Sequence, residues 1–467
     1  MKKMNAFVSN ILVRIIRVTP IILIAIFFRV IIKERLKNRK DRFVFKKQSN
    51  RYSLLALDSQ RYREDLDILA KSDKFRVLHL RQGWQLLIVK AFLKGKNYVS
   101  EIENLDESSK LGKEHKKTND FVLNVLNKFF KLIEIDCVTT VHFKYIADYY
   151  WVNSCEKLNK PWIMLYRECN VMSPIIYDTV VGMMKKQNPF KGSHVIVHNK
   201  RIKDAFLESN FCSTQKITVA SALRMDQLVK KSKQIEHLKF DSILSKRKKF
   251  TLFYFPVDSS MFGSMNESID IKKYYPEGNY WVHREKYFTQ LHEAILELAE
   301  ENRDIDFVIK PKKIFMHDKS WSYYEKVISN SKVDVKKLDN YVIDADANVH
   351  NLIIESSIIC GGQSSTTIES LLMKKPIILP FFCDYHKTDY FAQFPWKDYL
   401  DLFNVVRDVD SFKSTFRVLI NSNDISENEM SKRKELYLSC FDDYTGRAVD
   451  RYTETIQKVI LKANDLD

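Results

Sequence analysis

The chain has 467 residues, of which 45% are hydrophobic and 12% aromatic, and this composition excludes a disordered or fibrous protein. At roughly 150 residues per domain, the length predicts two or three domains. The net charge is +17, and +11 of it lies in the first fifty residues, where thirteen Lys and Arg face only Glu34 and Asp41. A nucleic-acid-binding domain usually spreads its basic residues over a folded face. Their concentration beside an apolar stretch therefore favours a membrane surface as partner and argues against nucleic acid.

The first predicted element is an apolar helix within residues 11–32, interrupted by Arg14, Arg17 and Arg29. Its longest uncharged run, Val18–Phe28, is shorter than the roughly 20 residues that a helix needs to cross a bilayer. We expect residues 5–47 to contact the membrane surface, either as an in-plane amphipathic helix or as a single span lengthened by snorkelling arginines. In both cases the basic residues that follow hold the body of the protein at the cytoplasmic face. The alternative is a helix packed on the protein's own surface.

Short apolar runs then alternate with helical patterns, which predicts an α/β fold with parallel strands. In the first half we expect an amphipathic helix at 121–133 and strands at 76–80, 137–141, 162–166, 194–198 and 216–219. A basic, helix-prone stretch at 227–249 follows, so we expect a domain boundary near residue 245.

The second half repeats the alternation. We expect strands at 250–255, 306–309, 333–338, 357–360 and 376–380, and helices at 287–301, 321–329, 348–355 and 366–373. The resulting division is a basic, apolar membrane-associated segment at 1–50, α/β domains at 51–245 and 246–420, and a helical tail at 421–467.

The seven cysteines are scattered singly, without a C-x-x-C pair. This spacing fits neither a disulfide framework nor a zinc site, and it predicts reduced thiols in a cytoplasmic protein.

The most informative segment is a glycine and hydroxyl loop that follows the predicted strand 357–360. The loop consists of Gly361, Gly362, Gln363, Ser364, Ser365 and Thr366. Glycines let backbone amides approach a ligand closely, and hydroxyls at a helix start suit a phosphate. Glu369, three residues after Thr366, is placed to accept from ribose hydroxyls. A capping box of Ser365 or Thr366 with Glu369 uses the same residue types, but the glycine pair and the preceding strand favour a nucleotide site.

The strand, this loop, the Thr-x-x-Glu helix and the following Lys-Pro-Ile strand together resemble the donor-site half of GT-B glycosyltransferases, particularly those of capsule and surface polysaccharide biosynthesis. Residues 306–312, Asp-Phe-Val-Ile-Lys-Pro-Lys, are similar to the basic strand end that faces the donor phosphates in such enzymes. Residues 220–226 resemble the segment that closes the first domain. The chain departs from the pattern because no His follows Pro311 and Ala222 stands where proline is usual.

The resemblance implies two Rossmann-like domains facing a cleft, with the acceptor on 51–245 and the nucleotide donor on 246–420. It implies a glycosyltransferase that moves a sugar from a nucleotide-sugar donor to a lipid-linked or surface-polysaccharide acceptor, with no cofactor and no obligatory metal. The alternatives are a CDP-glycerol-type polyol-phosphate transferase or a nucleotide-sugar epimerase of the same fold, or a non-catalytic scaffold of polysaccharide assembly. The usual Asp-Tyr-Ser-Ser element of the CDP-glycerol group is replaced here by Gly-Gly-Gln-Ser-Ser, which disfavours that group.

Lys310 and Lys312 are the expected partners of the donor diphosphate, because cations at a strand's carboxyl end stabilise a leaving nucleotide diphosphate. The alternative is a solvated lysine cluster. Glu168, directly after the strand 162–166, is the expected general base, unless it simply pairs with Arg167.

His142 is the second candidate for the base, although a lone histidine is more often structural. Arg81 and Gly83, at the end of the strand 76–80, are expected beside the donor's sugar or phosphate. Arg224 is expected to hold the interdomain segment.

Overall fold

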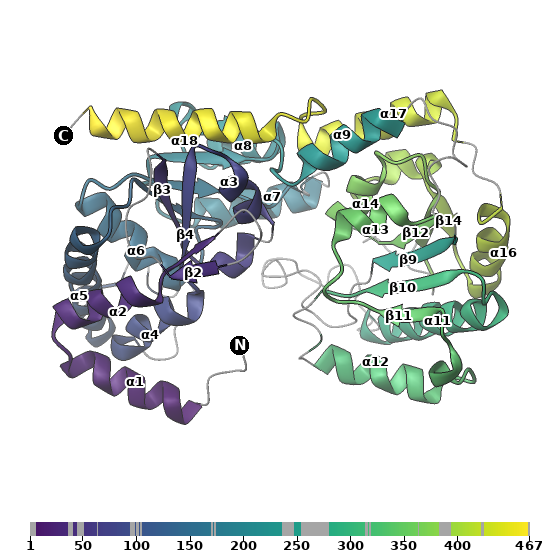
Figure 1. Cartoon of the computed structure of the whole chain (residues 1–467), viewed down its shortest axis with the longest axis horizontal. Coiled ribbons are helices and arrows are strands. Elements are labelled where there is room, and N and C mark those ends of the chain that lie inside the picture. Colours follow the sequence, from purple (N-terminus) through teal and green to yellow (C-terminus); the bar gives the residue numbers. More distant parts are fainter. Residues whose placement is uncertain are drawn as a thin grey trace. The chain divides into compact units, whose positions relative to one another are not determined.

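The computed structural model describes most of the chain. The described residues are 6–35, 41–43, 51–62, 64–93, 99, 102, 105–169, 171, 174–235, 247–253, 280–312, 316, 319–362, 364–382, 394–421 and 425–465. The chain forms two compact units (Figure 1). The first consists of Met1–Glu168, Val181–Asp226 and Thr445–Asp467, and the second of Cys169–Val180 and Gln227–Tyr444. The main division thus follows Asp226, and the last residues of the expected tail belong to the first unit.

The first unit is built on an eight-stranded sheet with the order β2-β1-β4-β3-β5-β6-β7-β8. The strands are β1 (Lys33–Arg35), β2 (Asp41–Phe43), β3 (Tyr52–Ala56), β4 (Phe75–His79), β5 (Cys137–Thr140), β6 (Trp162–Leu165), β7 (His194–Val197) and β8 (Ile217–Val219). Strands β3 to β8 are parallel, whereas β1 pairs antiparallel with β2 and β4. The five strands expected in this half are confirmed within one or two residues at their ends.

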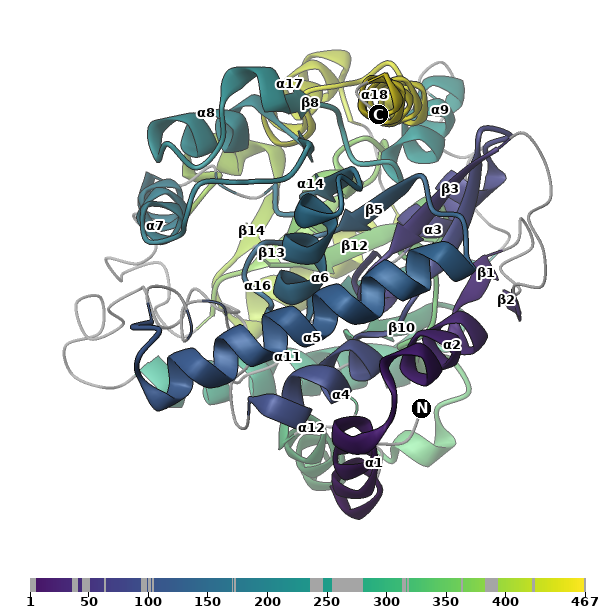
Figure 2. The same cartoon turned by 90° about the vertical axis from the view of Figure 1, so that its left-hand side faces the viewer.

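Helices cover both faces of this sheet (Figure 2). They are α3 (Asp65–Lys71), α4 (Gln82–Phe92), α5 (Lys110–Leu132), α6 (Ile146–Lys157), α8 (Lys200–Glu208) and α18 (Ala448–Asn464), while α7 (Pro174–Lys185) and α9 (Met225–Ile235) each run from one unit into the other. The C-terminal helix α18 buries Tyr452 and Ile456 in the same core as Leu66 of α3. The carboxylate of Asp226 accepts from the backbone amides of Ala448 and Val449 at 2.8 and 2.9 Å. It therefore fixes the start of α18, whose first amides have no partner inside the helix.

The apolar N-terminal segment forms two helices, α1 (Ala6–Val18) and α2 (Ile21–Ile31), separated at Pro20. Proline lacks the amide that would continue a helix through this point. Within the described part of the chain, no helix is long and apolar enough to cross a membrane. Helix α2 packs against α5, and α1 against α4.

Part of the basic cluster after α2 also belongs to the first sheet. Glu34, at the centre of β1, is 2% exposed and its Oε2 accepts from Nε of the buried Arg76 on β4 at 3.2 Å. The Nε atom of Arg35 lies 3.3 Å from Oδ1 of Asp67 on α3. Residues 33–35 are thus ordered by strand pairing and by ion pairs.

The second unit is built on a six-stranded sheet, all parallel, with the order β11-β10-β9-β12-β13-β14. The strands are β9 (Lys249–Phe253), β10 (Asp306–Lys310), β11 (Tyr341–Ile343), β12 (Ile358–Gly361), β13 (Ile377–Pro380) and β14 (Asn404–Val406). The expected strand at 333–338 is wrong. Asp334 caps a short 3-10 turn, Val335–Lys337, by accepting from the amide of Lys336, and the strand forms only afterwards.

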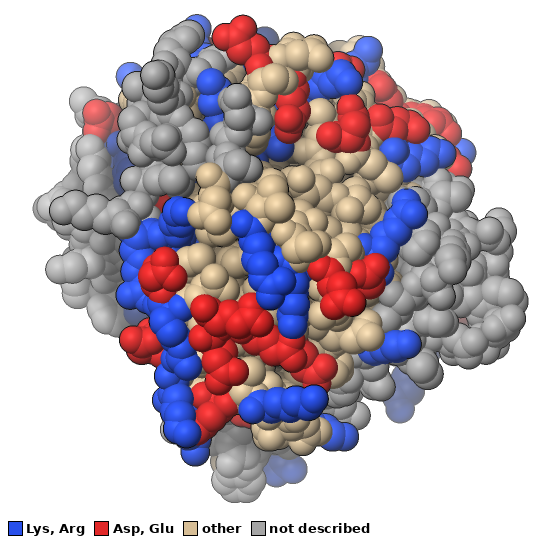
Figure 3. Space-filling model, turned by 90° about the vertical axis from the view of Figure 1, so that its right-hand side faces the viewer, with Lys and Arg blue, Asp and Glu red and all other residues tan. Residues whose placement is uncertain are grey.

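The helices of this unit are α11 (Tyr280–Glu301), α12 (Lys319–Asn330), α13 (Val349–Glu355), α14 (Ser365–Ser370), α16 (Val409–Leu419) and α17 (Glu427–Phe441). Ion pairs join α16 to α11, between Lys413 and Glu297 and between Arg417 and Glu301. Figure 3 shows acidic and basic side chains interspersed on the face of this unit turned to the viewer. The expectation of an α/β protein with two units and parallel sheets is confirmed.

Candidate active site

Among the described parallel strands, each sheet contains one switch point, where consecutive strands begin to be added on the opposite side of the first strand. In the second sheet, β10 and β11 are added on one side of β9, and β12 then returns to the other side. In the first sheet, β4 is added on one side of β3 and β5 on the other. The loops at the carboxyl ends of the two strands diverge at such a point, and open α/β sheets bind ligands there. The candidate site of the second unit is therefore at the ends of β9 and β12, and that of the first unit is at the ends of β3 and β5.

The glycine loop occupies this position in the second unit. Gly361 is the last residue of β12 and pairs with Phe253 at the end of β9. A Cβ atom on Gly361 would lie 2.9 Å from Oγ1 of Thr367, so a larger residue would displace that side chain. A Cβ atom on Gly362 would meet no atom of the described residues within 4 Å. Gly361 is thus required by packing, whereas Gly362 leaves open space at the carboxyl end of the strand.

The hydroxyl residues of the loop divide into two roles. Ser364 is buried and caps α14, because its Oγ accepts from the amide of Thr366 at 3.2 Å. Ser365 and Thr366 are half-buried in the first turn of the helix. Gln363 lies outside the described residues.

Glu369 is buried at 2% exposure, and its Oε2 lies 3.1 Å from Nε2 of His350 in the first turn of α13. The capping box considered above is wrong, since Ser364 is the cap and the Glu369 carboxylate meets another helix. The pair instead joins α13 and α14, the two helices that flank β12. Glu369 lies in the helix that follows the glycine loop. Its contact with a ribose stays a prediction.

Lys310, at the carboxyl end of β10, is half-buried. Its Nζ donates to the carbonyl oxygens of Pro311 and Ala345 at 3.0 and 2.8 Å. Lys312 is exposed. The ammonium of Lys310 is therefore held at the strand end by backbone carbonyls, one strand beyond β9.

In the first unit, a chain of buried polar groups lies where β3 and β5 end. Asp58 has a φ of 48°, an uncommon conformation for a residue with a side chain, and it is 1% exposed. Its amide donates to Oε1 of Gln85 at 2.9 Å, and Nε2 of Gln85 donates to Oδ1 of Asp148 at 2.8 Å. The Oδ2 atom of Asp148 is buried and has no hydrogen-bond partner among the described residues. Burial, and next the nearby charge of Asp58, raise the pKa of Asp148 to about 8, so this carboxyl holds its proton at neutral pH.

A half-exposed arginine connects this chain to the surface of the unit. Nε of Arg61 donates to Oδ2 of Asp58 at 2.5 Å, and Nη1 donates to the hydroxyl of Tyr145 at 2.8 Å. The guanidinium carbon lies 3.7 Å from the centre of the Tyr145 ring. Two hydrogen bonds and the stacked ring fix the orientation of the fork, as suits the recognition of a phosphate or carboxylate.

His142, in the loop after β5, lies beside this arginine. Its Nδ1 accepts from the amides of Phe143 and Lys144 at 3.0 and 3.2 Å, so the proton of the neutral ring resides on Nε2. Burial, and then the positive charges of Lys144 and Arg61, hold the pKa of His142 well below its usual range. In this state the Nε2–H group of His142 is available as a hydrogen-bond donor, which opposes the expected role of general base.

The other expected residues of the first unit are dispersed. Glu168 is exposed, and Arg167 does not pair with it but with Asp65, whose Oδ2 lies 3.2 Å from Nε of Arg167. Arg81 is half-buried and Gly83 exposed at the start of α4, after β4. Arg224 is buried in the first unit, close enough to Tyr452 of α18 for the two side chains to interact electrostatically.

The sequence analysis missed Asp58, Arg61, Gln85, Tyr145 and Asp148. The apolar run 54–57 followed by Asp58 and Ser59 was the available signal for the end of a strand. Gln85 and Asp148 lie 63 positions apart, so their contact has no signature in the sequence.

Comparisons with known proteins find similarity in solved structures alone. No family model matches the chain, and no curated protein matches it. The UDP-GlcNAc 2-epimerase of Neisseria meningitidis, solved with bound UDP-GlcNAc, is 14% identical and aligns over 87% of this chain and 100% of its own, with a TM-score of 0.44. The wall teichoic acid polymerase TagF is 12% identical over 99% of both chains, with a TM-score of 0.44. An α,α-trehalose-phosphate synthase (UDP-forming) of Burkholderia vietnamiensis is 10% identical over 89% of this chain and 99% of its own, with a TM-score of 0.44.

Proposed function

We propose that this protein is a glycosyltransferase that moves a sugar from a nucleotide-sugar donor to a lipid-linked or surface-polysaccharide acceptor at the cytoplasmic face of the membrane. The observation that carries the proposal is the glycine loop at the switch point of the second sheet. Gly362 there leaves space above the strand end, and backbone amides in such a loop suit the oxygens of a diphosphate. The resemblance of residues 250–390 to the donor half of GT-B enzymes supports the same assignment.

The donor site is proposed to comprise Gly361, Gly362 and the half-buried hydroxyls of Ser365 and Thr366. Lys310 and Lys312 supply the positive charge at the neighbouring strand end that stabilises the departing nucleotide diphosphate. Glu369, held in place by His350, is proposed to accept hydrogen bonds from the ribose hydroxyls. Gln363 belongs to the loop by sequence.

The acceptor is proposed to bind at the carboxyl ends of β3 and β5 in the first unit. Arg61 and Nε2 of His142 are donors there and suit an anionic group of the acceptor. Removal of the acceptor hydroxyl's proton requires a carboxylate that water or substrate reaches, and Glu168 is the exposed candidate from the sequence. Arg81 and Gly83 remain predicted contacts of the donor's sugar or phosphate, and Arg224 remains predicted to hold the interdomain segment.

The two loop glycines provide the test. Gly362→Val should fold normally, because a Cβ atom there meets no described residue within 4 Å, and it should abolish the thermal stabilisation produced by a bound nucleotide sugar. Gly182→Val is the matched control, since a Cβ atom on Gly182, in α7, also lies more than 4 Å from the atoms that the structure describes around it. UDP-GlcNAc, other nucleotide sugars and CDP-glycerol serve as probes in a thermal-shift assay, followed by product analysis.

The outcomes separate the alternatives. Stabilisation by a nucleotide sugar, lost in Gly362→Val and kept in Gly182→Val, together with transfer to an added acceptor, supports the proposal. Stabilisation by CDP-glycerol alone identifies a polyol-phosphate transferase, and interconversion of the sugar without transfer identifies an epimerase. Absence of stabilisation by every nucleotide favours the non-catalytic scaffold and would overturn the proposal.

A further inference from the structure

Helix α2 is apolar on two opposite faces. On its inner face Ile24, Ala25 and Phe28 are buried at 4, 0 and 1% exposure, and the ring of Phe28 lies 5.3 Å from that of Trp151 on α6. On its outer face Leu23 and Val30 remain 52 and 58% exposed. The inner face accounts for the packing of α2 on the first unit, whereas nothing among the described residues covers the outer face.

Helix α1 has the same construction. Val13 is buried against Leu87 and Ala91 of α4, and Nε of Arg17 donates to the Ala91 carbonyl at 2.5 Å. On the outer side Ile15 and Val18 are 48 and 82% exposed. Both helices are thus fixed by one side and present large aliphatic side chains on the other. Figure 2 shows α1 beside α4 and α2 beside α5.

This exposure is concentrated in one place. Among the described residues, twelve large hydrophobic side chains are exposed, and eight of them belong to α1 and α2. Soluble proteins rarely leave such a cluster in water, so a clustered apolar surface indicates a binding face.

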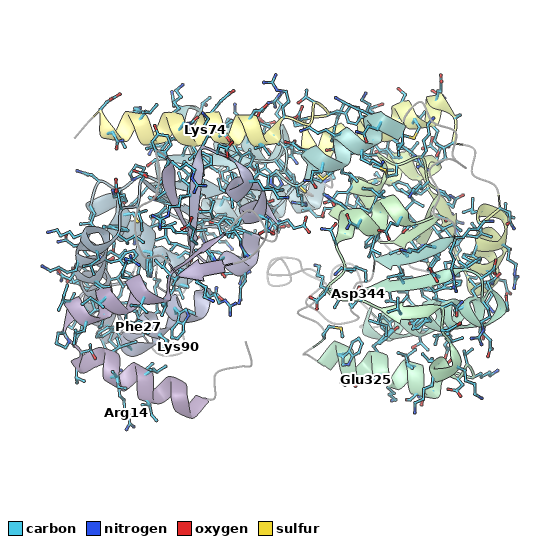
Figure 4. The ribbon with its side chains drawn as sticks, in the orientation of Figure 1. Arg14, Phe27, Lys74, Lys90, Glu325 and Asp344 are labelled. Carbon is cyan, nitrogen blue, oxygen red and sulfur yellow. The ribbon has the colours of Figure 1, made fainter. Side chains whose placement is uncertain are left out.

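The charges around the exposed apolar surface of α1 and α2 indicate which kind of partner it binds. Residues 1–33 contain six Lys and Arg and no Asp or Glu. Arg14 is exposed on α1 and projects away from α4, and Lys90 is exposed on α4 (Figure 4). An apolar face with a cationic margin complements the anionic headgroups and acyl boundary of a lipid leaflet. A second copy of this chain would bring the same positive charges against it, which disfavours a dimer.

We propose that the outer faces of α1 and α2 dock the first unit onto an anionic bilayer, with both helices lying in the interface and neither crossing it. Their inner faces are committed to the core, so a spanning arrangement would first have to unpack Phe28 and Val13. The inference deepens the proposed location of the enzyme by naming the surface and the lipid chemistry, and it does not depend on the donor assignment.

The test uses the full chain and vesicles of phosphatidylcholine mixed with phosphatidylglycerol, compared with vesicles of phosphatidylcholine alone. We expect co-sedimentation with the anionic vesicles and weaker binding as salt is raised. Val18→Glu with Val30→Glu should lower the partition coefficient at least tenfold. Because both side chains are exposed, the variant should keep the circular dichroism spectrum and melting temperature of the wild type.

Val342→Glu with Val418→Glu is the matched control. These two valines, on β11 and α16 of the second unit, are 50 and 63% exposed, so the control makes the same chemical change elsewhere and should bind vesicles like the wild type. Equal loss in both double variants, or no loss in Val18→Glu with Val30→Glu, would overturn the proposal. So would light scattering that shows a wild-type dimer dissociated by the α1–α2 variant, because the face then serves a second copy. Nucleotide-induced thermal stabilisation, measured on the same variants, reports the proposed function separately.

Discussion

Oε2 of Glu369 lies 3.1 Å from Nε2 of His350, and both side chains are buried between the helices that flank β12. This contact connects Glu369, which the sequence predicts to bind a ribose, to His350, which the sequence analysis did not consider. It makes Glu369 part of the fold as well as of the proposed donor site.

Glu369→Ala should lower the free energy of unfolding by about 1–3 kcal/mol, since it leaves His350 buried without this partner. Glu369→Gln retains an acceptor for Nε2 of His350 and should lose less. Urea unfolding monitored by circular dichroism measures both. If both variants had the unfolding free energy of the wild type, the contact between Glu369 and His350 would not stabilise the fold.

Asp148→Asn should change how stability depends on pH. The folded pKa of about 8 lies above the unfolded value of 3.8, so between these values the unfolded chain binds fewer protons than the folded one. Wild-type stability should therefore fall as pH rises from about 4 to about 8, by at most about 1.4 kcal/mol per pH unit from this group. The Asn variant lacks this loss. Its unfolding free energy, relative to that of the wild type, should therefore increase as pH rises. Asp120→Asn, at an exposed position, is the control, and identical pH profiles for all three proteins would contradict the assignment.

Arg61→Lys should weaken acceptor use while leaving donor binding intact. Lysine keeps the charge but cannot bond Asp58 and Tyr145 together while stacked on the ring. We expect about a tenfold lower kcat/KM for the acceptor, equivalent to about 1.4 kcal/mol. Steady-state kinetics with each substrate varied in turn measure this, and an equal loss for the donor would place Arg61 elsewhere in the reaction.

Glu34→Ala should destabilise the first unit by about 3–5 kcal/mol, because it leaves Arg76 buried at 3% exposure without the carboxylate 3.2 Å away. Glu34→Leu combined with Arg76→Met removes both charges and should cost less than the single change. Thermal and urea unfolding decide between these outcomes. A Glu34→Ala variant as stable as the wild type would mean that the Glu34–Arg76 ion pair does not stabilise the first unit.

The sequence by itself determined the alternation of strands and helices, because each buried parallel strand requires a short apolar run and each covering helix an apolar stripe. It also located the glycine loop, since the residue types that allow close backbone approach are adjacent in the chain. It placed the apolar and basic segment at the N-terminus, but it left open whether that segment spans, lies flat or packs on the protein.

Only the tertiary structure decided which polar side chains meet. Asp58, Gln85 and Asp148 come together because β3 and β5 are neighbours at the switch point of the first sheet, and strand order is set by packing between distant segments. The same holds for His350 and Glu369, for Arg167 with Asp65, and for Asp226 at the start of α18. The two-sided character of α1 and α2 also appears only when their inner faces are buried, since an apolar pattern does not say which face finds the core.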